Sequence, residues 1–250
     1  MPRLTVLLFL AIASLGLSAC ETSLTRQQAG AVHKIGVISA IGSELNIRSF
    51  MPNAGGQDGL LDVVPIGDMA LDPYVIDQAT ARLKDHYEIV PVAYSPATFR
   101  QTEDERNLHA AAIQGRTLGQ VIRANTQLPD GMTAGTDSGV DIYLVILAGG
   151  AKLRDGDHAL SGTSLTEMPA ENGPAYNLGV VYWIAVIDGH SLQSVGNVNT
   201  LSDRNVDAKL WAPTAQALTA DQKQQLAAVW KKRIDLTLAP ALKRVPLDIQ

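Results

Sequence analysis

A single cysteine, Cys20, is the feature that most restricts how this chain can fold. It excludes any internal disulfide, so the folded state has to be held together by a buried apolar core. The cysteine directly follows a segment in which Arg3 gives a positive start and Leu4–Leu17 is an almost unbroken apolar run. The run has the length of a signal-peptide core and is too short to span a bilayer as a helix. We therefore expect residues 1–19 to be removed and to take no part in the fold.

The junction Leu17-Ser18-Ala19-Cys20 resembles the lipobox of bacterial lipoproteins, which has a leucine, two small residues and an obligatory cysteine. The resemblance covers residues 1–20. It implies cleavage before Cys20, a diacylglycerol on its sulfur, and a further acyl chain such as palmitate on the new amino terminus. Two or more such chains give stable membrane anchoring. The alternative is an ordinary secretory signal beside a chance cysteine.

Glu21 follows the cysteine where enterobacterial lipoproteins retained in the inner membrane carry Asp. By the sorting logic that the resemblance implies, the outer membrane is favoured over the inner membrane. The chain is then expected in the cell envelope, with its domain facing the periplasm.

The mature chain, residues 20–250, carries a formal charge of −6, because 19 Lys and Arg stand against 25 Asp and Glu. Binding to nucleic acid or to anionic lipid needs clustered basic residues, so this charge disfavours both as partners. About 230 residues suffice for one domain that buries on the order of 70% of the surface of the unfolded chain. Beyond the leader the longest apolar run, Gly179–Ile187, has only the length of a strand.

We expect residues 20–33 to be the lipidated cysteine and a short tether, because residues 21–33 are polar or small and show no periodicity. Residues 34–250 are expected to form one soluble α/β domain. Strands are predicted at Lys34–Ala40, Leu45–Phe50, Glu88–Tyr94, Val140–Ala148, His158–Thr166, Asn177–Asp188 and Ser191–Asn199. The second strand and the segment Gly162–Thr166 are expected to be half exposed. Asp188-Gly189 predicts a two-residue hairpin turn.

Three helices are predicted from their start signals. Asp72 can cap a helix whose first residue is Pro73. Thr102 and Glu105 form a capping box that begins a second helix, and Thr219 with Gln222 forms another. Each predicted helix should have one apolar face. In the first helix this face consists of Ile76, Ala79, Leu83 and Tyr87, and in the second of Leu108, Ala112, Leu118 and Ile122. In the third helix it consists of Leu226, Trp230, Ile234 and Leu238.

The second predicted helix contains Gly115 and Gly119, which we interpret as close packing on the chain's own sheet rather than on a partner. Pro240 is expected to end the third helix, and a short helix is expected near Asp207–Trp211. The order of elements predicts a single α/β domain, with a mixed sheet, a C-terminal antiparallel strand meander and helices packed on the sheet.

No motif for catalysis, metal binding or phosphate binding meets its own requirements. Gly162-Thr163-Ser164 lacks the second glycine of a nucleophile elbow. Asp155-Gly156-Asp157-His158 is the densest group of metal-ligand types, yet it has the composition of a turn. Gly149-Gly150-Ala151-Lys152 does not fit a phosphate loop. We therefore assign no catalytic residue, no metal ligand and no cofactor.

Two residues carry functional expectations. Cys20 is the lipidation site. Trp211, next to Pro213, is the candidate for an exposed partner surface, whereas Trp183 and Trp230 lie in apolar patterns and are expected in the core.

The first functional hypothesis is a non-catalytic envelope lipoprotein whose domain binds a protein or helps to assemble the envelope. In element order it resembles small accessory lipoproteins that assist envelope secretion or cell-wall synthesis. The alternatives are an envelope hydrolase with a loop site and a small-molecule binding module. Thirteen residues separate Cys20 from Lys34 and span ~45 Å at most, so we expect a protein partner, or a second copy, at the same membrane.

Overall fold

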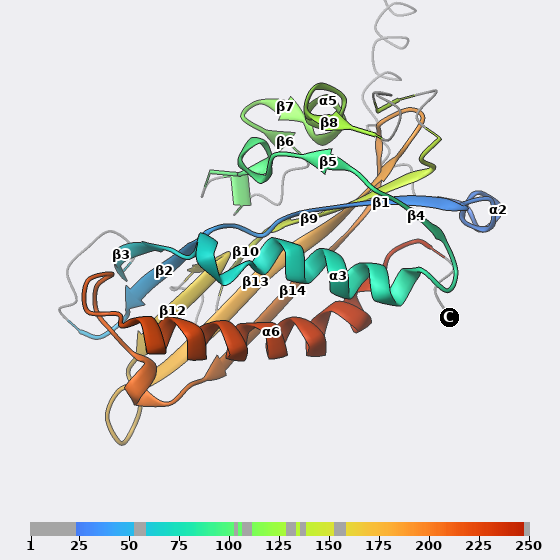
Figure 1. Cartoon of the computed structure of the whole chain (residues 1–250). Coiled ribbons are helices and arrows are strands. Elements are labelled where there is room, and N and C mark those ends of the chain that lie inside the picture. Colours follow the sequence, from blue (N-terminus) through green and yellow to red (C-terminus); the bar gives the residue numbers. More distant parts are fainter. Residues whose placement is uncertain are drawn as a thin grey trace, which may run out of the picture.

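The computed structural model describes residues 24–52, 59–102, 105–106, 112–128, 134–135, 139–152 and 159–247. In this part of the chain a mixed sheet lies between helices on its two faces (Figure 1). The elements follow in the order α2 (Arg26–Gly30), β1 (Lys34–Ala40), β2 (Glu44–Ser49), β3 (Leu60–Pro65), α3 (Leu71–Leu83), β4 (Glu88–Val90), β5 (Ala93–Tyr94), β6 (Ala112–Ile113), β7 (Arg116–Thr117), α5 (Leu118–Asn125), β8 (Thr126–Gln127), β9 (Ile142–Ala148), β10 (Gly150–Lys152), β11 (Ala159–Ser161), β12 (Thr163–Met168), β13 (Ala175–Asp188), β14 (Ser194–Asn205) and α6 (Ala220–Leu242). Short 3-10 turns occupy Gly67–Met69, Pro96–Phe99 and Ala208–Leu210.

The long strand β13 organises the sheet. Along one edge its first half pairs antiparallel with β12 and its second half with β9. Along the other edge β14 pairs antiparallel with almost its whole length. Next to β9 and β12 run β1 and β2, parallel to them, and the sheet ends at β4 beside β1 and β3 beside β2. The predicted mixed sheet with a C-terminal antiparallel meander is therefore confirmed.

The strands β9 and β12 form one line that is interrupted by a hairpin. Gly149 donates its N–H to the carbonyl of Val181, and Val181 donates its own N–H to the carbonyl of Gly162, each at 2.9 Å. A third bond, from the Gly162 N–H to the Gly149 carbonyl at 2.8 Å, closes the base. The chain between these two glycines, with β10 and β11, leaves the sheet there. Gly162 has φ +57, a conformation that glycine adopts without strain.

The helices α3 and α6 lie side by side over one face of the sheet (Figure 1). Alternate residues of the strands point into this layer, because side chains along a strand alternate between the two faces. Leu226, Trp230, Ile234 and Leu238 of α6 are all buried against it, as predicted. The Tyr74 hydroxyl of α3 donates to Asp235 Oδ1 of α6 at 2.7 Å, which ties the two helices together at the surface.

The opposite face is covered by α5 and the short strands β5 to β8 (Figure 1). Val121 and Ile122 of α5 pack there with Tyr143, Val145 and other residues from the sheet. The sheet is thus buried on both faces around β9 and β13. Trp183 is on this second face and is 2% exposed, so its predicted place in the core is confirmed.

The expectation that two strands are half exposed is wrong. Both faces of β2 are buried from Leu45 to Ser49, and β12 is buried from Thr163 to Thr166. The hairpin between β9 and β12 explains the difference, because Leu160 of β11 lies so close to Gly179 that a Cβ there would meet its Cδ1 at 2.9 Å. The hairpin therefore covers a polar part of the sheet that sequence patterns assign to solvent.

The second predicted helix is also wrong in extent. Its capping box is present, since the Thr102 N–H donates to Glu105 Oε2 at 2.7 Å. However, Gln114 and Gly115 both have positive φ and form the turn of the hairpin β6–β7. A new helix, α5, then begins at Leu118 with its own capping box from Thr117 and Gln120. Residues 107–111 lie outside the described residues.

Other boundaries differ from prediction for local reasons. The Asp188 carboxylate accepts three hydrogen bonds from residues 190 and 191, so the predicted two-residue turn is a longer one. Helix α6 runs through Pro240 to Leu242 rather than ending before it. Residues 26–30, predicted to lack regular structure, form α2 with a capping box from Thr25 and Gln28. The short helix predicted near Asp207 is present at Ala208–Leu210.

Candidate functional site

A crevice opens where β4 leaves β1. The two strands pair only from Lys34 to Gly36 of β1, whereas β9 accompanies β1 as far as Ala40. The phenol of Tyr94 replaces the lost partner strand: it accepts a hydrogen bond from the Ser39 N–H at 2.8 Å and donates one to the Ser39 carbonyl at 2.7 Å. The backbone of β1 is therefore satisfied, and the space beyond it stays open.

The crevice lies at a point of the sheet topology where α/β proteins commonly bind ligands. The strands β4, β1 and β9 are parallel neighbours. After β1 the chain passes through α3 to β4 on one side, and later through α5 to β9 on the other side. The connections diverge at the carboxyl end of β1, and in open α/β sheets such a point leaves a binding crevice.

Asp72 lies in the wall of the crevice, in the first turn of α3. Its Oδ1 accepts hydrogen bonds from the Ser39 hydroxyl and from the Ile41 N–H, each at 2.8 Å. Burial raises the pKa of this carboxyl above its usual value, although the bonds from Ser39, Ile41 and Gly42 and the charge of Arg100 act in the opposite direction. The ionised form of Asp72 is thus held in a place where its charge is poorly solvated.

Arg100, which directly follows the 3-10 turn Pro96–Phe99, also lines the crevice. One of its Nη atoms donates to the hydroxyl of Ser43. Its charge influences Asp72, yet no ion pair within 4 Å joins the two side chains, although both are described. The cavity that both side chains line has a volume of about 380 Å³. Its lining is mostly small or apolar: Ala40, Gly42, Ser43, Ile66, Gly67, Ala70, Leu71, Asp72, Pro73, Ser95, Pro96, Ala97 and Arg100.

Tyr94 adds rigidity rather than acid–base chemistry to this site. Burial raises its pKa to about 12, so the phenol stays protonated at physiological pH and keeps donating to the Ser39 carbonyl. The polar groups of the crevice are a hydrogen-bonded carboxylate, a guanidinium and hydroxyls, so it can bind charged or polar groups. No nucleophile and base are paired among its described residues.

The prediction that Asp72 caps α3 is wrong. The residue that caps α3 is Ala70, with φ +50, and the Asp72 side chain bonds to β1 instead of to its own helix. The helix begins two residues earlier than predicted, at Leu71, which packs into the core at 3% exposure. Ser43, Tyr94 and Arg100 carried no pattern that marked them. The only sequence signal was a carboxylate in the first turn of a helix that follows a strand.

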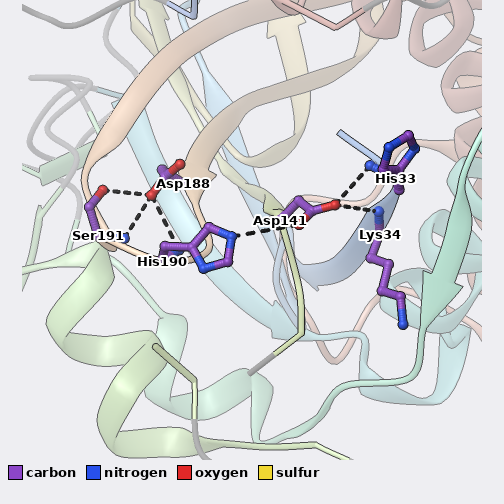
Figure 2. Close-up of polar contacts among 6 residues, drawn as sticks. All are labelled: His33, Lys34, Asp141, Asp188, His190 and Ser191. Atoms are coloured by element: carbon purple, nitrogen blue, oxygen red, sulfur yellow. Dashed lines mark hydrogen bonds and ion pairs between the residues drawn. The ribbon is translucent and has the colours of Figure 1, made fainter. Parts of the chain in front are cut away.

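A second polar cluster lies at the opposite end of β1 and has the residue types of a hydrolase site. Figure 2 shows His190 and Ser191 from the turn after β13, together with Asp141 at the start of β9. The His190 imidazole faces Asp141, with Nε2 3.6 Å from Oδ1, and forms an ion pair when protonated. The Ser191 hydroxyl donates to Asp188 Oδ1 at 2.7 Å.

The contacts in this cluster stabilise the fold and do not form a catalytic pair. A serine nucleophile needs its hydroxyl within hydrogen-bond reach of the base, but among the described residues no hydrogen bond joins the Ser191 hydroxyl to an imidazole. Asp141 Oδ2 instead accepts the backbone N–H groups of His33 and Lys34 at 2.8 and 2.9 Å, as Figure 2 shows. The cluster joins the starts of β1 and β9 to the turn after β13.

The remaining sequence candidates are placed as follows. Ser164 is fully buried and donates to the Ser161 carbonyl at 3.1 Å, which is no place for a nucleophile. Residues 155–158, the densest group of ligand types, lie outside the described residues. Among the residues that the structure does describe, no three His, Cys, Asp or Glu side chains group as metal ligands.

Trp211 is partly buried rather than fully exposed. Its ring stacks on Tyr176, with centroids 5.3 Å apart and planes at 28°. Its carbonyl accepts a hydrogen bond from Gln222 Nε2 in the first turn of α6 at 3.3 Å. Tyr176 is at the start of β13 and Asp188 at its end, so the Trp211 surface is ~40 Å along that strand from the end where β1 begins.

Cys20 lies outside the described residues, but its immediate surroundings in the chain are informative. Leu24 is partly buried and packs against the core on the α3 and α6 side of the sheet. No described helix is both long and apolar enough to cross a membrane.

Comparisons with known proteins add little. No family model and no curated protein matches the chain. Among solved structures, protein XCC0632 from Xanthomonas campestris, which carries the family name DUF330, aligns with a TM-score of 0.30 and 12% identity. The alignment covers 86% of this chain and 88% of that protein. At this level of similarity no residue or role is carried over from it.

Proposed function

We propose that the protein is a lipid-anchored envelope accessory domain without catalytic activity, which binds a protein partner or a second copy of itself at its own membrane. Its anchor is Cys20, and the outer membrane is the favoured location because Glu21 follows the cysteine. What carries the proposal is the distance between the anchor and the folded domain.

That distance is much shorter than the sequence alone indicated. Leu24 already packs on the core and α2 follows at once, so four residue steps separate Cys20 from the domain. Four extended residues span ~14 Å, against ~45 Å for the thirteen-residue tether inferred from composition. A domain held this closely has a high effective concentration toward anything anchored in the same membrane.

The same distance orients the domain. The starts of β1, β4 and β9 and the turn after β13 belong to the end of the sheet where α2 is attached (Figure 1). This end is the one nearest to the anchor. The Trp211 surface is then ~40 Å farther from the membrane. A partner that uses Trp211 would have to extend a domain of its own to that height.

Photocrosslinking in cells tests the proposal. A photoreactive residue at Gln27, in α2, and one at Lys209, near Trp211, sample the two ends of the domain, and both side chains are exposed. We expect crosslinks to the protein itself or to proteins of the same membrane, and their loss when Cys20→Ala releases the domain. Crosslinks mainly to proteins of the opposite membrane would refute a same-membrane partner.

The hydrolase alternative has no supporting geometry in the described residues, since the serine and imidazole of the cluster in Figure 2 contact different carboxylates. The small-molecule alternative does have a supporting observation, which is the crevice between Asp72 and Arg100.

A further inference from the structure

The crevice at the carboxyl end of β1 holds two opposite charges that do not neutralise each other directly. Asp72 and Arg100 line the same cavity of about 380 Å³, and no ion pair within 4 Å joins them. A cavity of this size is at the small end of the range found for ligand sites. An occupant that pairs with both side chains would carry a cationic group and an anionic group in one small molecule.

Both charged groups can form further hydrogen bonds with a ligand. A carboxylate accepts about four hydrogen bonds, and three donors, from Ser39, Ile41 and Gly42, reach Asp72. A guanidinium carries five N–H donors, and Ser43 takes a bond from one Nη of Arg100. Burial of the Asp72 carboxylate makes an incoming cation favourable, because the raised pKa reflects a charge that lacks solvation.

The site is rigid and its walls are apolar. Tyr94 and Asp72 fix the end of β1 by four hydrogen bonds of 2.7–2.8 Å. The lining of the cavity also includes Ile66, Leu71 and Pro96, against which an aliphatic group can pack. Ala70 holds a left-handed conformation at φ +50, a strained state that tends to persist at binding sites.

We propose that this crevice binds a small zwitterion of the α-amino acid type, with its ammonium group toward Asp72 and its carboxylate toward Arg100. The choice of a zwitterion is independent of the lipid anchor, whereas its source rests on the proposed anchoring. With the tether at the other end of β1, six residue steps place the crevice ~20 Å from the membrane-facing end of the sheet, so a free solute is expected rather than a lipid head group.

Thermal unfolding of the full chain in detergent, with added L-alanine, tests this proposal. We expect the melting temperature to rise with the logarithm of the alanine concentration once this exceeds the dissociation constant, and not to rise with ethylamine or propionate, which each carry one of the two charges. The logarithmic rise follows from ligand binding to the folded state alone. Arg100→Gln, at an exposed position, should weaken the apparent affinity at least tenfold, and Asp72→Asn should do the same.

Arg123→Gln is the matched control, because Arg123 is an exposed arginine of α5 that does not line the cavity. It should leave the response to alanine unchanged. The proposal is overturned if 20 mM alanine gives no shift, if propionate or ethylamine alone gives the same shift, or if Arg100→Gln responds like the Arg123 control.

Discussion

Replacing Trp230 by alanine is expected to lower the free energy of unfolding by ~3–5 kcal/mol, a large share of the ~5–15 kcal/mol that stabilises a typical domain. Trp230 is 1% exposed in the centre of α6. Its indole N–H donates to the Thr163 hydroxyl of β12 at 3.0 Å, so the substitution leaves both a cavity and a buried hydroxyl without its donor. Urea unfolding at an unchanged m-value measures the loss.

Two further variants separate the causes. Trp230→Phe keeps most of the ring and loses the hydrogen bond, so it should cost ~1 kcal/mol beyond the small change in volume. Trp211→Ala removes a partly exposed ring that stacks on Tyr176 and should cost clearly less than Trp230→Ala. Equal losses for the two alanine variants would mean that α6 does not pack on the sheet as described.

The substitution Gly119→Ala is expected to destabilise the protein by ~2 kcal/mol or more, even though alanine favours a helix. A Cβ at residue 119 would lie 2.0 Å from the Leu192 carbonyl oxygen, so α5 or the turn after β13 has to move. Leu192 is itself strained at φ +58, which leaves the turn little freedom to adjust.

Gly30→Ala is the control for this effect. Gly30 is also helical, but a Cβ there meets nothing within 4 Å. It should be neutral or stabilising by up to ~1 kcal/mol. If Gly119→Ala were as stable as Gly30→Ala, the contact between α5 and the turn would be refuted. The sequence predicted that Gly115 and Gly119 pack on the chain's own sheet. Instead Gly115 lies in the β6–β7 turn with nothing within 4 Å of an added Cβ, and Gly119 meets Leu192 in the turn after β13.

Sequence patterns predicted those elements in which the spacing of apolar residues shows which face is buried. The stripe Leu226, Trp230, Ile234 and Leu238 marks a helix because residues four apart share a face, and β1 was placed at its true boundaries. The fold class followed from this order of elements. The patterns failed where a turn interrupts a helical spacing, as at Gln114 and Gly115, because positive φ at both residues overrides propensity.

The candidate site was missed for a different reason. Asp72, Ser43, Tyr94 and Arg100 come from four segments and meet only because β4 leaves β1 early. One sequence does not give the length of a strand pairing. The second strand was predicted to be half exposed because its contact with the hairpin is long-range: Asn46 Nδ2 donates to the Ser161 carbonyl of β11 at 3.0 Å. Conversely, His190 and Ser191 are neighbours in sequence, yet the His190 imidazole faces Asp141 whereas the Ser191 hydroxyl bonds to Asp188.

The most direct test of the proposed function is the lipid on Cys20. Cells that express the native chain, and cells that express Cys20→Ala, are grown with labelled palmitate, and the immunoprecipitated protein is counted. We predict label in the native protein alone, together with a native product that lacks residues 1–19. Equal labelling of the two proteins, or a native protein without label, would contradict a lipid-anchored domain held against its membrane.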